Sequence, residues 1–247
     1  MNFGAKALSG KAPSGICADR GQSYQSIESS AASIRLLIAP DVPVHEALPG
    51  LQLFEWLDHY IVNTASGPVQ LEPAVEPLPP GVEGWTRYDK PRNRIVVALS
   101  SDTYEELERD NHRARFSFGH EVGHGVLHPN ELMRTGTLTR QMAALRRGEA
   151  LLHKKFMDTE WQANAFAAAL LIPAAGLVSL EKLIFPIPLD AFFISNHFKV
   201  SSETAAYRLE SFQTRRMQLL AQSMSRNLPS NTGGATRQAA TNRSLAA

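Results

Sequence analysis

The sequence predicts an α+β fold, in which a small antiparallel sheet lies beside helices. Two observations carry this prediction. The apolar, β-branched run at Ile95–Leu99 is typical of a buried strand. Helical spacing of apolar residues then appears between Ser101 and His128, and again between Glu160 and Ile172. Apolar residues make up 43% of the 247 residues, which is enough to build a buried core around these elements.

Strands are expected in the first half of the chain. Leu51–Val62 carries a helical stripe of apolar residues and precedes them. Five prolines between residues 66 and 84 exclude a helix there, although Val69–Leu71 can form a short strand. Beyond the prolines, Trp85–Tyr88 and Arg94–Leu99 flank a polar turn, which indicates a strand–turn–strand unit.

The helices of the second half have recognisable ends. Ser101 or Asp102 can cap the first helical stretch, which continues, with a possible break near Asn111, until Pro129 ends it. Asp158 or Thr159 can cap the next, which stops before Pro173. Shorter helices are expected at about 175–184, 188–198 and 201–215.

The two ends of the chain differ in composition from its middle. Residues 1–33 are rich in Ser, Ala and Gly without a sustained period, and residues 222–247 resemble them, so we expect both to be disordered. The folded domain is therefore predicted over 34–221, and a chain of those residues alone is expected to fold. Within it, the basic segment 140–155 is typical of a solvated helix face, or alternatively of a rim that meets an acidic partner.

Charge and cysteine content exclude several classes of protein. The net charge of +1 gives no overall field that would recruit nucleic acid or an anionic membrane. The single cysteine, Cys17, excludes an internal disulfide framework. The longest apolar stretch, Ala165–Val178, is too short to span a bilayer and contains Pro173. Since the N-terminus also lacks an apolar secretion signal, we expect a cytoplasmic protein without a membrane partner.

The most informative motif is His120-Glu121-Val122-Gly123-His124. On a helix, histidines four residues apart share one face, so His120 and His124 can converge on one ion such as Zn²⁺. Glu121 lies beside the first histidine and can reach a water on that metal, which is the position of a general base in hydrolysis. The alternative is an ordinary helix with two surface or core histidines.

A metal site on this helix needs a third ligand from elsewhere in the chain. Without a nearby cysteine, that ligand must be His, Asp or Glu, and Glu160 is a candidate. Asn164 follows one turn later and can hydrogen-bond to a ligand imidazole, fixing its orientation. The small side chains of Ala163 and Ala167 would let the two helices approach closely.

Two blocks of sequence resemble the ImmA/IrrE family of metallopeptidases. They are Arg115–His124, which contains the motif, and Glu160–Pro173, where an acid precedes Ala-Asn-Ala-Phe-Ala and Leu-Leu-Ile-Pro. The resemblance extends over roughly residues 45–215. It implies a zincin-like fold of the gluzincin type, with one Zn²⁺ or another divalent ion held by His120, His124 and Glu160, and Glu121 as the general base.

The same resemblance implies hydrolysis of peptide bonds in a protein substrate, such as a helix-turn-helix repressor. The chain departs from the family in having Gly119 before the first histidine and Gln162 where many relatives have a second acid. Residues 1–44 are too short and irregular for the DNA-binding domain that many relatives carry. A catalytically weak partner-binding module, of the toxin–antitoxin or regulatory kind, is the alternative function.

Several other residues admit a second interpretation. His128 is too far along the helix to share an ion with His120, so we expect it at the helix end supporting a ligand, with hydrogen bonding to a transition state as the alternative. His112, His153 and His197 are expected at the surface. Phe198–Leu209 resembles a helix-turn-helix, but in this family such a segment belongs to the peptidase fold, so direct nucleic-acid binding is not predicted.

Overall fold

The structure is a computed structural model, and it describes residues 16–138 and 153–225. The first half of the chain contains the elements α2 (Tyr24–Ile38), α3 (Gly50–Trp56), the 3₁₀ turn η1 (Leu57–His59), β1 (Ile61–Thr64), β2 (Gly67–Val75), β3 (Gly84–Asp89), β4 (Arg94–Leu99) and α4 (Ser101–Glu108). The second half contains α5 (His112–Leu127), α6 (Pro129–Thr135), the 3₁₀ turn η2 (Lys155–Met157), α8 (Thr159–Leu171), α9 (Ala174–Ile184), α10 (Ala191–Phe198) and α11 (Ser202–Ser225).

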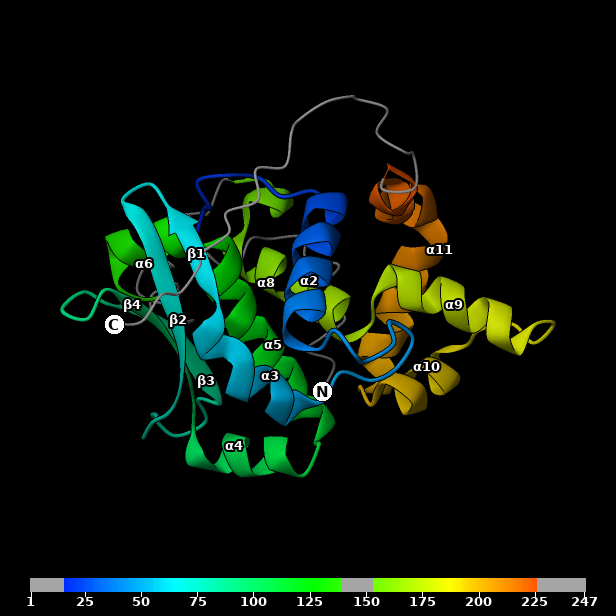
Figure 1. Ribbon diagram of the computed structural model, residues 1–247, viewed down its shortest axis with the longest axis horizontal. Coiled ribbons are helices and arrows are strands. Elements are labelled where there is room, and N and C mark those ends of the chain that lie inside the picture. Colours follow the sequence, from blue (N-terminus) through cyan, green and yellow to red (C-terminus); the bar gives the residue numbers. More distant parts are fainter. Residues whose placement is uncertain (1–15, 139–152, 226–247) are drawn as a thin grey trace, which may run out of the picture.

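This arrangement confirms the mixed α+β class and a small sheet beside helices. Figure 1 shows the four strands at one side of the molecule, α5 and α8 at its centre, and α9, α10 and α11 at the opposite side. The expected short helices in the last third of the chain are present. The apolar stripe over Leu51–Val62 is only partly helical, because the chain leaves α3 through η1 and enters β1 at Ile61.

The sheet is mixed, whereas the sequence predicts an antiparallel one. Its strand order is β1-β2-β4-β3, and β2 pairs parallel with β4 while both outer pairs are antiparallel. The difference arises because β3 forms the outer edge and β4 then returns between β3 and β2. All of Ile95–Leu99 is buried, as expected for an inner strand, and Ile95, Val97 and Leu99 belong to the hydrophobic core.

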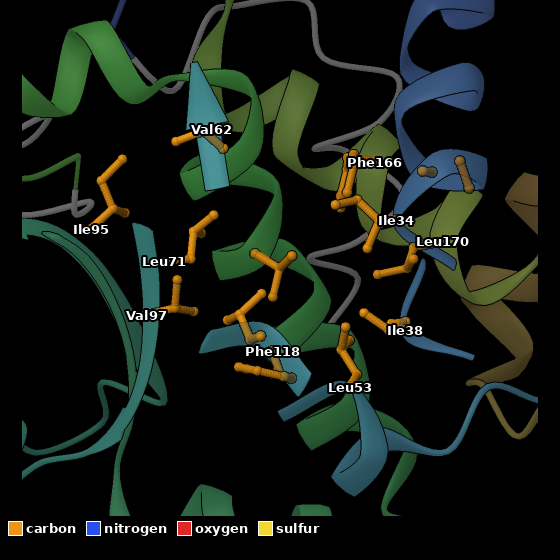
Figure 2. Packing of buried hydrophobic residues seen from close by; sticks show 14 of the residues in the cluster. Ile34, Ile38, Leu53, Val62, Leu71, Ile95, Val97, Phe118, Phe166 and Leu170 are labelled. Atoms are coloured by element: carbon orange, nitrogen blue, oxygen red, sulfur yellow. The ribbon is translucent and has the colours of Figure 1, made fainter. Parts of the chain in front are cut away.

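One hydrophobic core joins the sheet to α2, α5 and α8. Figure 2 shows Ile34 of α2 near Phe166 and Leu170 of α8, and Phe118 of α5 on the side toward the strands. A second cluster lies among α9, α10 and α11 and contains the fully buried side chains of Phe198 and Phe212. The site helices α5 and α8 are therefore packed from several sides, which gives them fixed relative positions.

The expected disorder of residues 1–33 is wrong for the part that the structure describes. Ser23 caps α2, and Ile27, Ala31 and Ile34 form its buried stripe. The nearly buried carboxylate of Glu28 accepts a hydrogen bond from the backbone N–H of Ala174 at 2.6 Å. The Ser- and Ala-rich composition conceals this helix, although its apolar positions recur at helical spacing.

Glu28 also forms a buried ion pair with Arg208 of α11, at 2.5 Å. Arg208 Nε donates to the carbonyl of Ile172, at the end of α8. The N-terminal helix is thus tied to the junction between α8 and α9 and to α11. Deleting it would leave a buried charge without its partner.

The remaining boundaries fall partly outside the described residues. Helix α11 extends to Ser225, past the expected domain end at 221, and is kinked at Arg215. Residues 1–15, 226–247 and most of the basic segment 140–155 lie outside the described part of the chain.

In the described residues, Thr159–Ile184 is the segment long and apolar enough to cross a membrane by those criteria alone. Of its most apolar window, 78% is buried inside the protein. The chain also leaves helical geometry at Ile172, between α8 and α9. This burial is typical of a core helix, whose apolar residues pack against the rest of the protein.

Candidate metal centre

Helix α5 presents the motif histidines toward α8. Asn111 caps its N-terminus by accepting from the backbone N–H groups of Arg113 and Ala114. Gly123 permits the approach of α8, because a Cβ at this position would lie 3.2 Å from both the Cα and the carbonyl oxygen of Ala163. At Gly119 a Cβ would make only ordinary contact with Ala167, so alanine would fit there.

Helix α8 brings Glu160 to the same place. Asp158 caps this helix by accepting from the N–H of Trp161 at 2.9 Å, which sets Glu160 in the first turn. The Glu160 residue is 4% exposed and His124 is 2% exposed. The two helices therefore place two imidazoles and one carboxylate in a nearly dry site.

The donor atoms converge at distances that suit a metal ion. His120 Nε2 and His124 Nε2 are 3.0 Å apart. Each lies 3.5 Å from an oxygen of Glu160. In a tetrahedral zinc site with bonds of about 2.0–2.1 Å, neighbouring ligand atoms lie roughly 3.3 Å apart. In the described residues, this is the group of His, Cys, Asp and Glu side chains that could hold an ion.

The lone pairs and the negative charge of these donor groups also favour a cation between them. His120 Nδ1 lies 3.0 Å from Asn164 Oδ1, which accepts a hydrogen, so Nε2 of this imidazole presents its lone pair. A second imidazole nitrogen and a carboxylate face the same point. Three electron-rich groups at this separation repel one another unless a proton or a metal ion lies among them. The residues present fit a divalent metal.

Without a metal, contacts within the donor group shift the pKa values of Glu160 and His120. Burial raises the pKa of Glu160, but the contacts with His120 and His124 outweigh it, so that the pKa lies well below its ordinary value. Burial lowers the pKa of His120, while the hydrogen bond and charge of Glu160 raise it by more. The carboxylate therefore stays ionised, as a metal ligand must.

Glu121 lies apart from these donors, between α5 and β3. Its Oε2 is 2.8 Å from Thr86 Oγ1, which is also 2.8 Å from the Glu121 carbonyl oxygen. Gly84 leaves room for it, because a Cβ there would come within 3.0 Å of Glu121 Cγ. No motif in the sequence points to Thr86. Its inward position on the edge strand was the available signal, but strand pairing was needed to place it.

His128 caps the C-terminal end of α5, as predicted from the sequence, and is 0% exposed. Its Nδ1 lies 3.1 Å from His124 Nδ1, and its Nε2 lies 2.9 Å from Gln162 Oε1. Burial, and then the charge of His124, lower the pKa of His128 to about 3. A neutral His128 therefore contacts His124 at Nδ1, the ring nitrogen that does not face the donor group.

The three histidines expected at the surface differ in exposure. His112 is exposed, as expected. The surface prediction is wrong for the other two. His153 is half-buried against Asp158 Oδ2 at 3.0 Å, and His197 Nε2 lies 2.5 Å from the carbonyl oxygen of His45.

A groove of about 470 Å³ lies away from these groups, between α2 and β1. It contains none of the candidate metal donors. Its walls are formed by Ser26, Ser29, Ser30, Ser33, Tyr60, Ile61, Val62, Asn63 and Val126. The chemistry of the donor set, rather than the size of a cavity, identifies the candidate centre.

Comparison with known proteins adds a family to this geometry. The family model for the IrrE N-terminal-like domain, Peptidase_M78, matches residues 87–210, which include all the donors and Glu121. No curated protein matches the chain. A solved structure of a Mycobacterium tuberculosis transcriptional regulator is similar, with a TM-score of 0.42 and 16% identity over 78% of this chain. The match spans about half of the regulator, 48% of its chain, and a likeness at this level establishes no common function.

Proposed function

The chain belongs to the family of IrrE N-terminal-like domains, and from that premise we propose that it is a zinc-dependent endopeptidase. The observation that carries the proposal is the convergence of His120, His124 and Glu160, with Glu121 next to the first histidine but outside the donor group. His120, His124 and Glu160 would hold the ion. Glu121 would act as the general base.

A divalent metal in this position would polarise a scissile carbonyl and lower the pKa of water toward about 7. The Glu121 carboxylate takes a proton from the attacking water and can return it to the leaving amine. Thr86 Oγ1 supports the ionised carboxylate by sharing its one hydrogen between Oε2 and the carbonyl oxygen of Glu121. That hydrogen bond also holds the side chain in place while Oε1 remains available to receive the proton.

The substrate belongs to the proposal as well. A protein substrate, such as a helix-turn-helix repressor, is consistent with the family, and a cytoplasmic location would bring the two together. The alternative of a partner-binding module with little catalysis makes a different prediction, because it requires no base. The function of Glu121 therefore decides between them.

The decisive experiment is the substitution Glu121→Gln in the full chain. We expect metal content near one ion per chain, as in the unchanged protein, and hydrolysis of a fluorogenic peptide library slower by at least ~10²-fold. Glu108→Gln, the same chemical change at an exposed site on α4, is the matched control and should retain full activity. Full activity of Glu121→Gln would refute the base, and simultaneous loss of metal would make Glu121 a ligand or a structural residue.

A further inference from the structure

A chain of hydrogen bonds runs from His124 away from the candidate metal centre. Its members are His128, Gln162 and the backbone carbonyls of Arg20 and Phe156, which we call the His124 support. Gln162 Nε2 donates to the Arg20 carbonyl at 3.1 Å and to the Phe156 carbonyl at 2.8 Å. Both hydrogens of the amide are therefore used, and each has an acceptor.

The direction of every bond in this chain follows from its far end. A carbonyl can only accept, so the amide nitrogen of Gln162 must face Arg20 and Phe156, and its oxygen must face His128. A flipped amide would set its oxygen against two other oxygens. The Gln162 oxygen in turn requires a hydrogen on His128 Nε2.

The same logic continues to the ligand. His128 is 0% exposed, and burial disfavours a charged imidazole, so this ring carries one hydrogen. With that hydrogen on Nε2, the lone pair of Nδ1 faces His124 Nδ1 at 3.1 Å. His124 must therefore carry its hydrogen on Nδ1 and present the lone pair of Nε2 to the donor group. This tautomer is the one that can bind a metal through Nε2.

We propose that His128 and Gln162 are positioning residues, which hold His124 in its metal-binding tautomer and anchor it to the N-terminal segment Ile16–Gln22. The inference rests on the proposed metal site, but not on peptidase activity. It gives the N-terminal segment a role at the centre, through the carbonyl of Arg20.

The anchoring segment is itself held by backbone pairing. Ala18 N–H donates to the carbonyl of Met157 at 2.7 Å, and Thr159 N–H donates to the carbonyl of Ile16 at 3.1 Å. Gln22 N–H donates to the same Phe156 carbonyl that Gln162 uses. The two carbonyls that accept from Gln162 thus belong to two neighbouring segments that are hydrogen-bonded to each other. This pairing keeps the two carbonyl oxygens at a separation that one amide group can reach.

The test uses two substitutions in the full chain. Gln162→Glu keeps the size of the side chain but cannot donate to the two carbonyls. His128→Phe fills the space but leaves His124 Nδ1–H without an acceptor. For both we expect Zn²⁺ affinity, measured by competition with a chromophoric chelator, to fall about 10–100-fold. Phe212→Leu, a buried substitution on α11 in the second hydrophobic cluster, is the control, and its affinity should be unchanged.

A second readout does not need metal. Imidazole ¹⁵N spectra of the metal-free full chain should show His124 protonated on Nδ1, and this preference should be lost in His128→Phe. A purely structural role would lower the unfolding temperature of both variants and leave the tautomer and the affinity unchanged, which would overturn the inference. If the unchanged chain binds no metal, the proposed function fails, whereas the ¹⁵N spectrum of His124 still decides the inference.

Discussion

His120 and His124 are chemically identical and lie one turn apart on α5, yet their second nitrogens meet different surroundings. His120 Nδ1 contacts one amide, Asn164, on the neighbouring helix. His124 Nδ1 leads through His128 and Gln162 to two backbone carbonyls. If the Asn164 amide flips, its nitrogen can still hydrogen-bond to His120 Nδ1. If the Gln162 amide flips, its oxygen faces two carbonyl oxygens and both hydrogen bonds are lost. Within this motif, His120 is therefore oriented by a single hydrogen bond, whereas His124 is oriented by a chain of hydrogen bonds that extends to the N-terminal segment.

The largest effect should come from removing the N-terminal residues 1–33. This deletion takes Ile27 and Ala31 out of the core, separates Arg208 from Glu28 and removes the Arg20 carbonyl. Breaking the buried pair alone costs about 3–5 kcal/mol, against a typical total stability of about 5–15 kcal/mol. We expect no cooperative thermal unfolding by circular dichroism and no bound metal.

A deletion of residues 1–15 alone is the control for that experiment, because it leaves the pairing with 156–159 in place. It should unfold cooperatively and bind metal. A folded, metal-binding chain that lacks 1–33 would instead support the domain boundary expected from composition, and it would remove the N-terminal anchor from our account of His124.

The next largest effect concerns the ligands themselves. His120→Ala and His124→Ala should each reduce the metal content from about one ion per chain to near zero, because two remaining donors form an incomplete site. Metal analysis of the purified chains measures this. His112→Ala, at the exposed start of the same helix, should keep its metal. If one of the two histidines proves dispensable, the comparison between their supports loses its basis.

A smaller effect should separate the two supports. Asn164→Ala removes one hydrogen bond to a partly exposed imidazole, so we expect Zn²⁺ affinity to fall about tenfold, at the low end of the range for such contacts. His128→Phe, measured in the same chelator competition, should cost more. Equal losses of Zn²⁺ affinity would mean that the hydrogen bonds beyond His128 add nothing to the effect of the bond between His128 and His124.

The smallest effect is a difference in how the stability contributions of His128 and His120 depend on pH in the metal-free protein. The pKa of His128 falls to about 3 in the folded protein, so its contribution to stability is complete above its ordinary pKa of about 6.5 and is lost as the pH drops toward 3. The expected slope is about 1.4 kcal/mol per pH unit in that window. Burial lowers the pKa of His120 but Glu160 raises it by more, so its contribution has the opposite sign and is lost as the pH rises.

Urea unfolding of the metal-free chain at pH 7, 6 and 5 measures the first of these slopes. His128→Phe should unfold with a smaller decrease between pH 6 and pH 5 than the unchanged chain. An identical pH dependence in the two proteins would show that His128 takes up its proton as readily when folded as when unfolded.

The elements with strong local signals could be predicted from the sequence. The spacing of His120 and His124 requires only a helix to align them, and Asp158 marks the start of the helix that carries Glu160. Even the contact between Asn164 and a ligand imidazole follows from one turn of that helix. In each case the interacting residues are separated by a fixed number of helical positions, or by the packing of two helices with small side chains.

The parts that could not be predicted depend on contacts between distant segments. Helix α2 is stabilised by burial against α8 and by the ion pair of Glu28 with Arg208, 180 positions away. Because these contacts are distant in the sequence, the Ser- and Ala-rich composition of α2 taken alone indicates disorder. The parallel pairing of β2 with β4 depends on which side of the sheet β3 occupies. The pairing of the strands leaves no local periodicity in β2 or β4, whereas α2 does repeat its apolar positions at helical spacing, but within a composition typical of disorder.

The sequence by itself determined the helix that aligns the two histidines, the acid that can meet them and the family to which these motifs point, because each is set by short-range geometry. Only the tertiary structure decided how the second nitrogen of each imidazole is used, where Thr86 meets Glu121 and why Arg20 matters to a site more than 100 positions later in the chain. Those features arise from hydrogen bonds that are satisfied only when separate segments are packed together, since a buried donor must find its acceptor wherever the fold supplies one.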